Sequence, residues 1–577
     1  MAKKSDLVIR VSGESGEGVI STGDLITLSS SRAGLEVYTF STFPAEIKGG
    51  NAMFEVRLSR DKLFAQGDKV DVFLAFNQEA YDMYIKDLNP ENGVLIYDSD
   101  AYTPPTVEGR IDYAIPLTSL AKEEVGALIT KNIVTIGCLV GLFDLPYDSI
   151  KDLIIEKFTR KGEKVVENNL KALDIGRQYC SEKIKKQDPY SIDEGSKTEK
   201  CIVVTGCDAI GMGAIVAGCK AYYGYPITPA TDVFKFLAKE LPKAGGVIMQ
   251  MEDEIAALAG CVGASYGGVK TLTATSGPGV SLMNEVLGYS SMAELPIVLV
   301  DVMRGGPSTG LPTKTEQSDL NCAIHGSHGE GPKIVISAAT VDECFYHTID
   351  AFNYAEEYQL PVILLTDGFT GGRKEAFPIP DLEKIKIVDR LRYQNVEDED
   401  YHRYEDTESG ISPISFPGDK GGRYTATGLE HTVKAKPAYD PDNRYVMMNK
   451  RFRKLQTFLK NVECCKVSGD KDAQIAILAW GSTAGACYEA IERLQNDGKK
   501  VKLIVPKILY PFPEEEIGKA LEGVTKVVIP ELNFTGQFAQ LVKAAFSNKV
   551  EVVQYNEYLG LPFKPHQIVD KFMEVSQ

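Results

Sequence analysis

The segment that decides the fold covers residues 251–285 and reads MEDEIAALAGCVGASYGGVKTLTATSGPGVSLMNE. Residues 255–267 are rich in Ala and Gly, which predicts a helix that another backbone can approach closely. The run at 271–275 predicts a buried strand, and the glycines at 277 and 279 predict a tight turn into a second helix. Helix, strand, tight turn and helix in this order are typical of an α/β domain.

Alternating strand and helix patterns continue on both sides of this segment. The polar stretch 186–200, which carries Pro, Gly and Ser, offers no apolar face to bury and is predicted to be a linker. The sequence of 386–455 has no clear periodicity, and we interpret it as an ordered connector. The α/β domains are therefore expected at 1–185, 201–385 and 456–577.

Length and composition are those of a multidomain globular protein. With 577 residues the chain is too long for one hydrophobic core. The net charge of −17 argues against a nucleic-acid partner, because phosphate binding needs clustered Lys and Arg. No stretch approaches about 18 uninterrupted apolar residues, and the N-terminus lacks a secretory pattern. We therefore expect a cytoplasmic protein without membrane contact.

The cysteine pattern gives no sign of a metal centre. The chain has 11 cysteines, and CxxC spacing does not occur. The one close pair, Cys464 and Cys465, is adjacent. Zinc and iron–sulfur sites usually draw two ligands from one tight turn. We therefore expect no metal bound by this chain and mostly buried thiols.

A threonine between prolines and a run of acids stand out in the 201–385 domain. The prolines of YPITP (225–229) fix the backbone so that the Thr228 hydroxyl is presented. In MEDE, an acid at the head of a helix ordinarily complements the helix dipole, and this explanation suits Glu252 and Asp253. Glu254 has a second explanation, because thiamine enzymes use a buried glutamate to hydrogen-bond the aminopyrimidine ring of their cofactor.

Four motifs follow one another in this domain: YPITP at 225–229, MEDE at 251–254, TSGPG at 275–279 and RGGPSTGLPT at 304–313. In this order they resemble the pyrimidine-binding domain of the 2-oxoacid:ferredoxin oxidoreductases. The segments SGESGEG and EIKGG look like the gamma domain of that family, and the last domain looks like its transketolase C-terminal-type domain. The resemblance covers essentially the whole chain. It implies three α/β domains: a Rossmann-like gamma domain, a thiamine pyrimidine-binding domain and a transketolase C-terminal-like domain.

The resemblance also implies a role for each motif. Glu254 is the implied catalytic residue, which hydrogen-bonds the aminopyrimidine of thiamine diphosphate. Arg304 and Thr313 are similar to the pair that grips the carboxylate of a 2-oxoacid, Arg304 through a charge-assisted hydrogen bond. Thr228 is assigned to the 2-oxo or carboxylate end of the substrate. The other implied cofactor contacts are Tyr225, Pro226, Ile227, Ser276 and Gly277.

Lys48 bears on the choice of substrate. Taken alone, one lysine is ordinarily a solvated surface charge, but EIKGG supplies it where other members of the family resemble ERGG. In members that prefer a dicarboxylic oxoacid, a gamma-domain lysine that reaches the active site would meet the distal carboxylate. The expected substrate is therefore 2-oxoglutarate, with pyruvate or a branched-chain 2-oxoacid as alternatives.

The sequence departs from the family pattern in two places. The gamma-domain turn usually resembles GGQG, whereas this chain has SGEG, and the acids Glu14 and Glu17 would repel an anion, so binding of coenzyme A phosphate by this turn stays open. The GDG…N segment that binds the metal of thiamine diphosphate is absent from the sequence. The resemblance therefore implies a separate beta subunit that brings Mg²⁺, the diphosphate side of the pocket and a 4Fe–4S cluster.

The implied activity is the oxidative decarboxylation of 2-oxoglutarate to succinyl-CoA and carbon dioxide, with coenzyme A as co-substrate and ferredoxin as electron acceptor. The same site could run towards CO2 fixation, as in a reductive TCA cycle, and the expected assembly is a dimer of alpha–beta heterodimers. Two alternatives come from other classes. A transketolase- or decarboxylase-type enzyme should carry its own metal–diphosphate segment. A non-catalytic subunit that binds coenzyme A or a nucleotide would leave Glu254 and Arg304 without a purpose.

Overall fold

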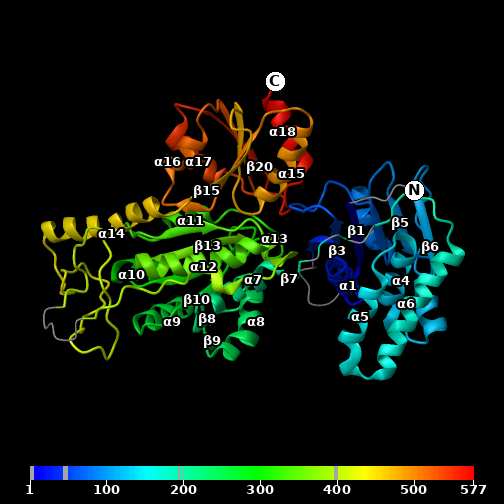
Figure 1. The fold of residues 1–577 in the computed structure, drawn as a ribbon, viewed down its shortest axis with the longest axis horizontal. Helices are drawn as coiled ribbons and strands as arrows, with labels where there is room; N and C mark the ends of the chain where they lie inside the picture. The colour runs from blue at the N-terminus through cyan, green and yellow to red at the C-terminus, as the bar shows by residue number, and fades with distance from the viewer. Residues whose placement is uncertain (1–5, 43–49, 193–194, 196, 198, 395–400) are drawn as a thin grey trace. The chain divides into compact units, whose positions relative to one another are not determined.

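The computed structural model describes residues 6–42, 50–192, 195, 197, 199–394 and 401–577 (Figure 1). The chain forms two compact units. The first combines Met1–Val204 with Arg373–Pro380, and the second combines Thr205–Gly372 with Asp381–Gln577. Helices and strands alternate in both units, so the predicted α/β class is confirmed. The predicted domain boundaries stay a prediction.

The first unit is built on an eight-stranded mixed sheet with the order β6-β5-β4-β1-β3-β2-β14-β7. Strand β3 is buried along its whole length, as expected for a central strand that is covered on both faces. Strand β14 follows the second unit's core in sequence, yet it pairs antiparallel with β2, Glu375 opposite Tyr38. The strands are β1 (Asp6–Glu14), β2 (Glu36–Thr42), β3 (Asn51–Ser59), β4 (Val72–Ala75), β5 (Val94–Asp98), β6 (Ile111–Ile115), β7 (Cys201–Thr205) and β14 (Lys374–Pro378).

The helices of the first unit pack closely enough to require glycine. A Cβ on Gly137 of α4 would lie 2.1 Å from the Leu173 carbonyl oxygen of α6, and a Cβ on Gly176 would lie equally close to the Val134 carbonyl oxygen. The two backbones are therefore in direct contact. The helices are α1 (Val19–Arg32), α2 (Gln78–Tyr84), α3 (Leu117–Ser119), α4 (Lys131–Phe143), α5 (Tyr147–Phe158) and α6 (Glu163–Lys183), with short helical turns η1 (Ile85–Asp87), η2 (Leu120–Val125), η3 (Leu128–Thr130) and η4 (Thr159–Lys161).

The second unit contains a seven-stranded sheet, β18-β12-β13-β11-β10-β8-β9, and a five-stranded sheet, β15-β17-β16-β19-β20. One apolar core extends from the first sheet to the second and includes the fully buried Trp480 and Phe538. The strand predicted at 271–275 is β10. The strands are β8 (Ala221–Gly224), β9 (Val247–Gln250), β10 (Thr271–Thr275), β11 (Ile297–Met303), β12 (Ile334–Ser337), β13 (Pro361–Asp367), β15 (Cys465–Gly469), β16 (Ile475–Leu478), β17 (Lys502–Pro506), β18 (Ile508–Tyr510), β19 (Lys526–Glu531) and β20 (Glu551–Asn556).

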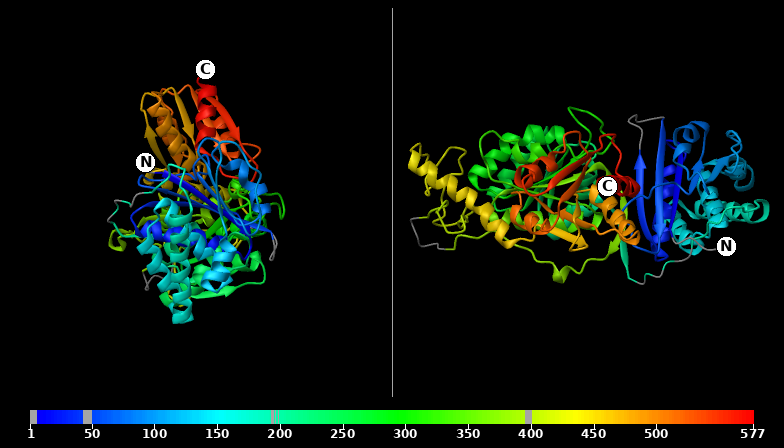
Figure 2. Two further views of the ribbon diagram at one scale, coloured as in Figure 1. Left: turned by 90° about the vertical axis from the view of Figure 1, so that its right-hand side faces the viewer. Right: turned by 90° about the horizontal axis from the view of Figure 1, so that it is seen from above.

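Helices pack in pairs on the seven-stranded sheet, α7 against α12 and α9 against α10. In Figure 2 the C-terminal elements, orange to red, form their own group of strands and helices. The helices are α7 (Gly206–Val216), α8 (Thr231–Glu240), α9 (Glu254–Tyr266), α10 (Gly277–Ala293), α11 (Leu320–His325), α12 (Val341–Tyr358), α13 (Gly368–Gly372), α14 (Pro441–Asn461), α15 (Thr483–Asn496), α16 (Glu514–Ala520), α17 (Gln537–Phe546) and α18 (Pro565–Val575), with turns η5 (Leu241–Ala244) and η6 (Leu382–Lys384). In the part of the chain that the structure describes, no helix combines the length and apolarity that crossing a bilayer requires.

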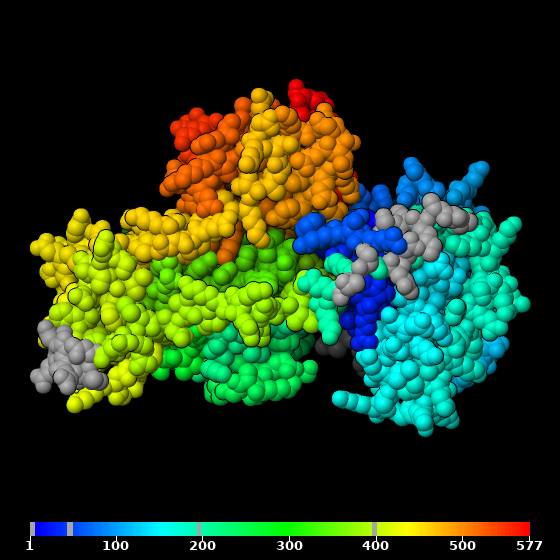
Figure 3. Space-filling view, viewed as in Figure 1, coloured from blue at the N-terminus to red at the C-terminus, as the bar shows by residue number. Residues whose placement is uncertain are grey.

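A buried charge cluster fixes α14, the long helix of the predicted connector, to the end of α10. Glu294 accepts hydrogen bonds from Lys450 Nζ at 2.7 and 2.8 Å, and Lys454 Nζ lies 2.5 Å from its Oε2 atom. All three side chains are fully buried. Burial alone would raise the pKa of Glu294, but the neighbouring cations outweigh it and lower this pKa, while burial lowers the pKa of Lys454 to about 7. Figure 3 shows the segment that contains α14, in yellow, on the surface of the second unit.

Glu294→Gln should destabilise the second unit strongly, because it leaves two buried lysines without their counter-charge. The expected loss is about 3–5 kcal/mol in the free energy of unfolding, measured by urea denaturation. Glu515→Gln removes an exposed acid that pairs with Lys519 and should leave the transition where it is. If the two variants unfolded at the same urea concentration, the cluster would not be what holds α14.

Candidate functional site

The candidate site lies at the carboxyl ends of β10 and β11, the edge where open parallel sheets place their ligands. The two strands pair in parallel, with Thr275 opposite Asp301. Ser276 leads from β10 into α10, and Arg304 follows the last residue of β11. The segments that carry Ser276, Gly277, Arg304 and Thr313 therefore begin side by side.

Glu254 is the first residue of α9, and it is buried with 7% of its surface exposed. The helix is capped by Asp253, whose side chain accepts a hydrogen bond from Ala256 N at 2.8 Å, so Glu254 is not needed as the cap. A Cβ on Gly279 would lie 2.8 Å from Glu254 Cγ and 1.9 Å from Thr275 Oγ1. Glycine therefore lets α10 approach this carboxylate, which has no hydrogen-bond partner among the described residues.

The turn from β10 into α10 also leaves a polar atom without a partner. Ser276 is fully buried, and its Oγ atom has no hydrogen-bond partner in the described part of the chain. A Cβ on Gly277 would lie 2.7 Å from Asp319 Oδ2. The glycine is therefore required where this turn meets the loop before α11.

The YPITP motif reaches the same edge through its backbone. Arg304 donates a hydrogen bond from Nη1 to the Thr228 carbonyl oxygen at 2.7 Å. Thr228, Tyr225 and Pro226 are exposed, and Ile227 is half-buried. The structure thus joins the motif to Arg304, one of the predicted substrate residues.

One predicted substrate residue, Thr313, is not joined to Arg304, and another, Lys48, is not among the described residues. Thr313 is exposed, and no hydrogen bond links it to Arg304 within the described residues. It lies beside Lys314, whose carbonyl oxygen closes the loop by accepting from Gly305 N at 3.0 Å. Lys48 falls in 43–49, outside the described residues, so its role stays a prediction.

Two acids near the ends of β10 and β11 were missed by sequence reasoning. Asp301 is fully buried, and burial raises its pKa well above the ordinary range. Burial, together with Glu316, raises the pKa of Asp319 to about 6. Burial also lowers the pKa of Arg304, which Asp319 opposes. An acid inside the apolar run IVLVDVM was the signal that could have revealed Asp301.

The glycine-rich SGESGEG turn of the first unit is filled by its own side chain. The Glu17 carboxylate accepts hydrogen bonds from Glu14 N at 2.8 Å, from Asn77 Nδ2 at 3.0 Å and from Lys131 Nζ at 2.9 Å. A Cβ on Gly13 would lie 2.7 Å from the same carboxylate. Three donors around this turn, Glu14 N, Asn77 Nδ2 and Lys131 Nζ, are therefore already engaged by Glu17.

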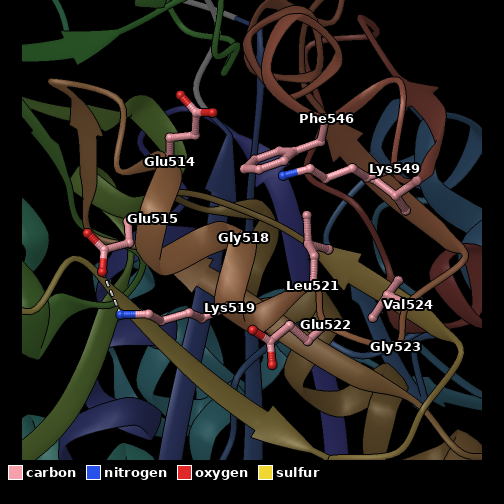
Figure 4. Close-up of a pocket in the computed structure, with 11 residues that line it drawn as sticks. Glu514, Glu515, Gly518, Lys519, Leu521, Glu522, Gly523, Val524, Phe546 and Lys549 are labelled. Atoms are coloured by element: carbon pink, nitrogen blue, oxygen red, sulfur yellow. Dashed lines mark hydrogen bonds and ion pairs between the residues drawn. The ribbon is translucent and has the colours of Figure 1, made fainter.

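A groove of about 690 Å³ lies between α16 and the end of α17. Its walls carry Glu515, which pairs with Lys519 at 2.7 Å, and Lys549, whose ammonium group lies 5.8 Å from the centre of the Phe546 ring (Figure 4). None of the predicted site residues lines this groove. No group of three or more His, Cys, Asp or Glu side chains is arranged to hold a metal ion within the described ranges.

Three family models match the chain in the order of its predicted domains. The model described as "Pyruvate ferredoxin/flavodoxin oxidoreductase" matches residues 8–179. "Pyruvate flavodoxin/ferredoxin oxidoreductase, thiamine diP-bdg" matches 212–450, which contains Glu254 and Arg304. "Pyruvate:ferredoxin oxidoreductase core domain II" matches 473–567.

Relatives match over nearly the full length. The alpha subunit of 2-oxoacid:ferredoxin oxidoreductase 2 of Aeropyrum pernix is 31% identical, over 99% of this chain and 98% of its own. The 2-oxoglutarate oxidoreductase subunit KorA of Mycobacterium tuberculosis is 33% identical, over 98% and 90%. The solved 2-oxoglutarate:ferredoxin oxidoreductase of Magnetococcus marinus, with 2-oxoglutarate, coenzyme A and succinyl-CoA bound, is 44% identical, covers 100% of both chains and superposes with a TM-score of 0.96. This chain therefore belongs to the family of thiamine-diphosphate-dependent 2-oxoacid:ferredoxin oxidoreductases, to which its alpha-subunit relatives belong.

Proposed function

We propose that this chain is the alpha subunit of a 2-oxoglutarate:ferredoxin oxidoreductase. The complete enzyme would convert 2-oxoglutarate, coenzyme A and two oxidised ferredoxins into succinyl-CoA, carbon dioxide, two reduced ferredoxins and a proton, in either direction. The observation that carries the proposal is the presence, at one sheet edge, of Glu254, a buried carboxylate without a partner among the described residues, and Arg304, a buried guanidinium. The full-length likeness to the Magnetococcus marinus enzyme supports the choice of substrate.

The residues at this edge fit the ring side of thiamine diphosphate. Glu254 and the Ser276 hydroxyl are buried polar groups without partners among the described residues, and Gly279 keeps the space beside Glu254 clear. When bound, the cofactor supplies the carbon nucleophile and the electron sink for decarboxylation. Glu254 would hold a proton at a ring nitrogen of the aminopyrimidine, and Ser276 and Gly277 would line the ring. Tyr225, Pro226 and Ile227 would complete the wall.

The oxoacid would be held mainly by charge. Arg304 would pair with the carboxylate beside the keto group, and its burial strengthens this attraction relative to water. Its bond to the Thr228 carbonyl oxygen keeps the guanidinium in place. Thr228 and Thr313 would fix the pose of the keto end, and Lys48 would meet the distal carboxylate.

Partners complete the site in this proposal. Relatives are named as alpha subunits, so the family works as an assembly of subunits. We infer that a beta subunit brings Mg²⁺, the diphosphate side of the pocket and a 4Fe–4S cluster, that the assembly is a dimer of alpha–beta heterodimers, and that ferredoxin takes the electrons. The absence of a GDG segment from the sequence supports this division of the site.

Coexpression of the chain with its beta subunit tests the proposal as a whole. The purified complex should reduce a viologen dye with 2-oxoglutarate and coenzyme A, with a kcat/KM higher than for pyruvate or branched-chain 2-oxoacids. A higher kcat/KM for pyruvate would show that pyruvate is the preferred substrate and would leave the family activity as proposed. A complex without turnover on any 2-oxoacid would favour the non-catalytic subunit instead.

Glu254→Gln in this complex should lower kcat about 10²- to 10⁴-fold, because the aminopyrimidine loses the group that positions its proton. The measurement is viologen reduction with 2-oxoglutarate and coenzyme A. Glu252→Gln is the matched control, since Glu252 is exposed two residues earlier. A Glu254→Gln complex as active as the control would exclude the role given to Glu254.

Lys48→Ala should raise KM for 2-oxoglutarate roughly 10- to 100-fold, the effect of losing one charged hydrogen bond of about 1.5–3 kcal/mol. KM for monocarboxylic oxoacids should change much less, because they have no distal carboxylate. Lys69→Ala removes an exposed lysine from the same unit and serves as the control. Equal losses on both classes of substrate would show that Lys48 does not read the second carboxylate.

A further inference from the structure

The loop that follows Arg304 is closed at its base by backbone hydrogen bonds. Residues 305–313 leave the end of β11, and Gly305 N donates to the Lys314 carbonyl oxygen at 3.0 Å. Leu311 N donates to the Gly305 carbonyl oxygen at 2.8 Å, so the two sides of the loop pair with each other. The tip of the loop is exposed. The position of the loop beside Arg304 therefore depends on how the residues after it are held.

The residues that follow the loop, 314–321, are held by the C-terminal elements β15 to α18, and we call them the anchor segment. A Cβ on Gly560 would lie 2.7 Å from Lys314 Cβ, so the backbone after β20 lies directly against the first residue of the segment. At the other end, α11, which begins within the segment, packs against α17 (Figure 1). The C-terminal elements therefore contact both ends of the anchor segment.

Gln317 ties the middle of the anchor segment to the five-stranded sheet, and it is fully buried. Its side chain donates from Nε2 to the Trp480 carbonyl oxygen at 2.7 Å and accepts from Leu532 N at 3.0 Å. Its backbone N donates to the Leu532 carbonyl oxygen at 2.7 Å, and its carbonyl oxygen accepts from Asn533 Nδ2 at 3.0 Å. One residue thus makes four hydrogen bonds to the segments that follow β16 and β19.

Gln537, the first residue of α17, holds the last part of the anchor segment. Its buried side chain accepts a hydrogen bond from Asn321 N at 2.8 Å and donates from Nε2 to the Ser318 carbonyl oxygen at 2.7 Å. None of these bonds, and none of the four bonds of Gln317, reaches a predicted site residue. An effect of either glutamine on the site must therefore pass through the anchor segment and the loop.

Burial makes these bonds a firm attachment. Breaking one would leave a polar group, such as the Trp480 carbonyl oxygen, without a partner in the interior, where the loss is not made good by water. The anchor segment is therefore fixed to the C-terminal elements. Because Lys314 belongs to this segment and pairs with Gly305, the base of the loop is fixed next to Arg304.

We propose that the C-terminal elements position the loop that binds the oxoacid, and that Gln317 and Gln537 are the positioning residues. A loop held in place before the substrate arrives loses less conformational freedom on binding, so the oxoacid binds more tightly. The proposal rests on the proposed function, in which Arg304 and Thr313 hold the keto end of the substrate. It gives the C-terminal elements a part in substrate binding that does not require them to touch the substrate.

Gln317→Ala in the active complex should raise KM for 2-oxoglutarate roughly 10- to 100-fold, because the displaced loop binds the oxoacid in fewer of its conformations. KM for pyruvate should rise by the same factor, since both substrates carry a carboxylate beside the keto group. KM for coenzyme A should stay close to the wild-type value, and kcat should fall much less than KM rises. Loss of folded enzyme alone would lower kcat and leave KM unchanged, so these constants separate positioning from a structural role.

Gln537→Ala and Gln540→Ala form a matched pair on α17. Gln537→Ala removes the two hydrogen bonds to the anchor segment and should raise KM for both oxoacids, as Gln317→Ala does. Gln540 is exposed and donates to the Thr535 carbonyl oxygen at 3.0 Å, within the C-terminal elements, so Gln540→Ala should reproduce the wild-type constants. This pair decides the question by itself if Gln317→Ala gives no folded complex.

Hydrogen–deuterium exchange of the complex without substrate gives a reading that does not depend on turnover. The amides of Gly305, Leu311 and Lys314, which are hydrogen-bonded, should exchange roughly tenfold faster in Gln317→Ala and Gln537→Ala than in Gln540→Ala. A folded Gln317→Ala or Gln537→Ala complex whose KM matches that of Gln540→Ala would overturn the role given to that residue. A wild-type complex that turns over no 2-oxoacid would instead overturn the proposed function, and exchange would still decide whether the C-terminal elements hold the loop.

Discussion

The structure depends on one constraint: polar groups without protein partners are buried where β10 and β11 end. Burying such groups is costly unless something binds them. The fold nevertheless gathers Glu254, Ser276 and the unpartnered Nε atom of Arg304 at this edge. Glycine at 277 lets α10 approach Asp319, and glycine at 279 lets it approach Glu254. A helix end and a strand end meet here because parallel strands finish on the same side of a sheet. These unpartnered groups make the edge less stable in the free protein, and the same groups are available to bind a ligand.

Much of this arrangement could be predicted because it is local. The small-residue helix, the strand at 271–275 and the glycine turn all have short-range signatures, and the motif order gave the α/β class and the family. The contacts that could not be predicted from the sequence join residues that are distant in the chain. Nothing in the five residues of β14 indicates that they pair with β2, and nothing near Asp319 shows that it meets Gly277. Contacts between residues far apart in the chain leave no trace in a local pattern.

The comparisons and the site bear on the two alternative functions, a transketolase-type enzyme and a non-catalytic subunit. A transketolase-type enzyme is disfavoured, because full-length relatives belong to the 2-oxoacid:ferredoxin oxidoreductases. A purely non-catalytic subunit would leave buried Glu254 and Arg304 as unexplained costs. In the proposed function, the site is one wall of a shared pocket, and this chain would contribute the hydrogen-bonding and charged groups that act on the cofactor ring and the oxoacid.

The Glu17 carboxylate in the glycine-rich turn has a consequence for ligand binding in the first unit. A group tethered three residues from its binding site is present at an effective concentration of millimolar or higher, whatever the composition of the surroundings. Dissolved phosphate or a phosphorylated metabolite would have to outcompete this built-in occupant and also separate it from Lys131. An external phosphate at this turn would therefore compete with Glu17 for the donors of Glu14, Asn77 and Lys131.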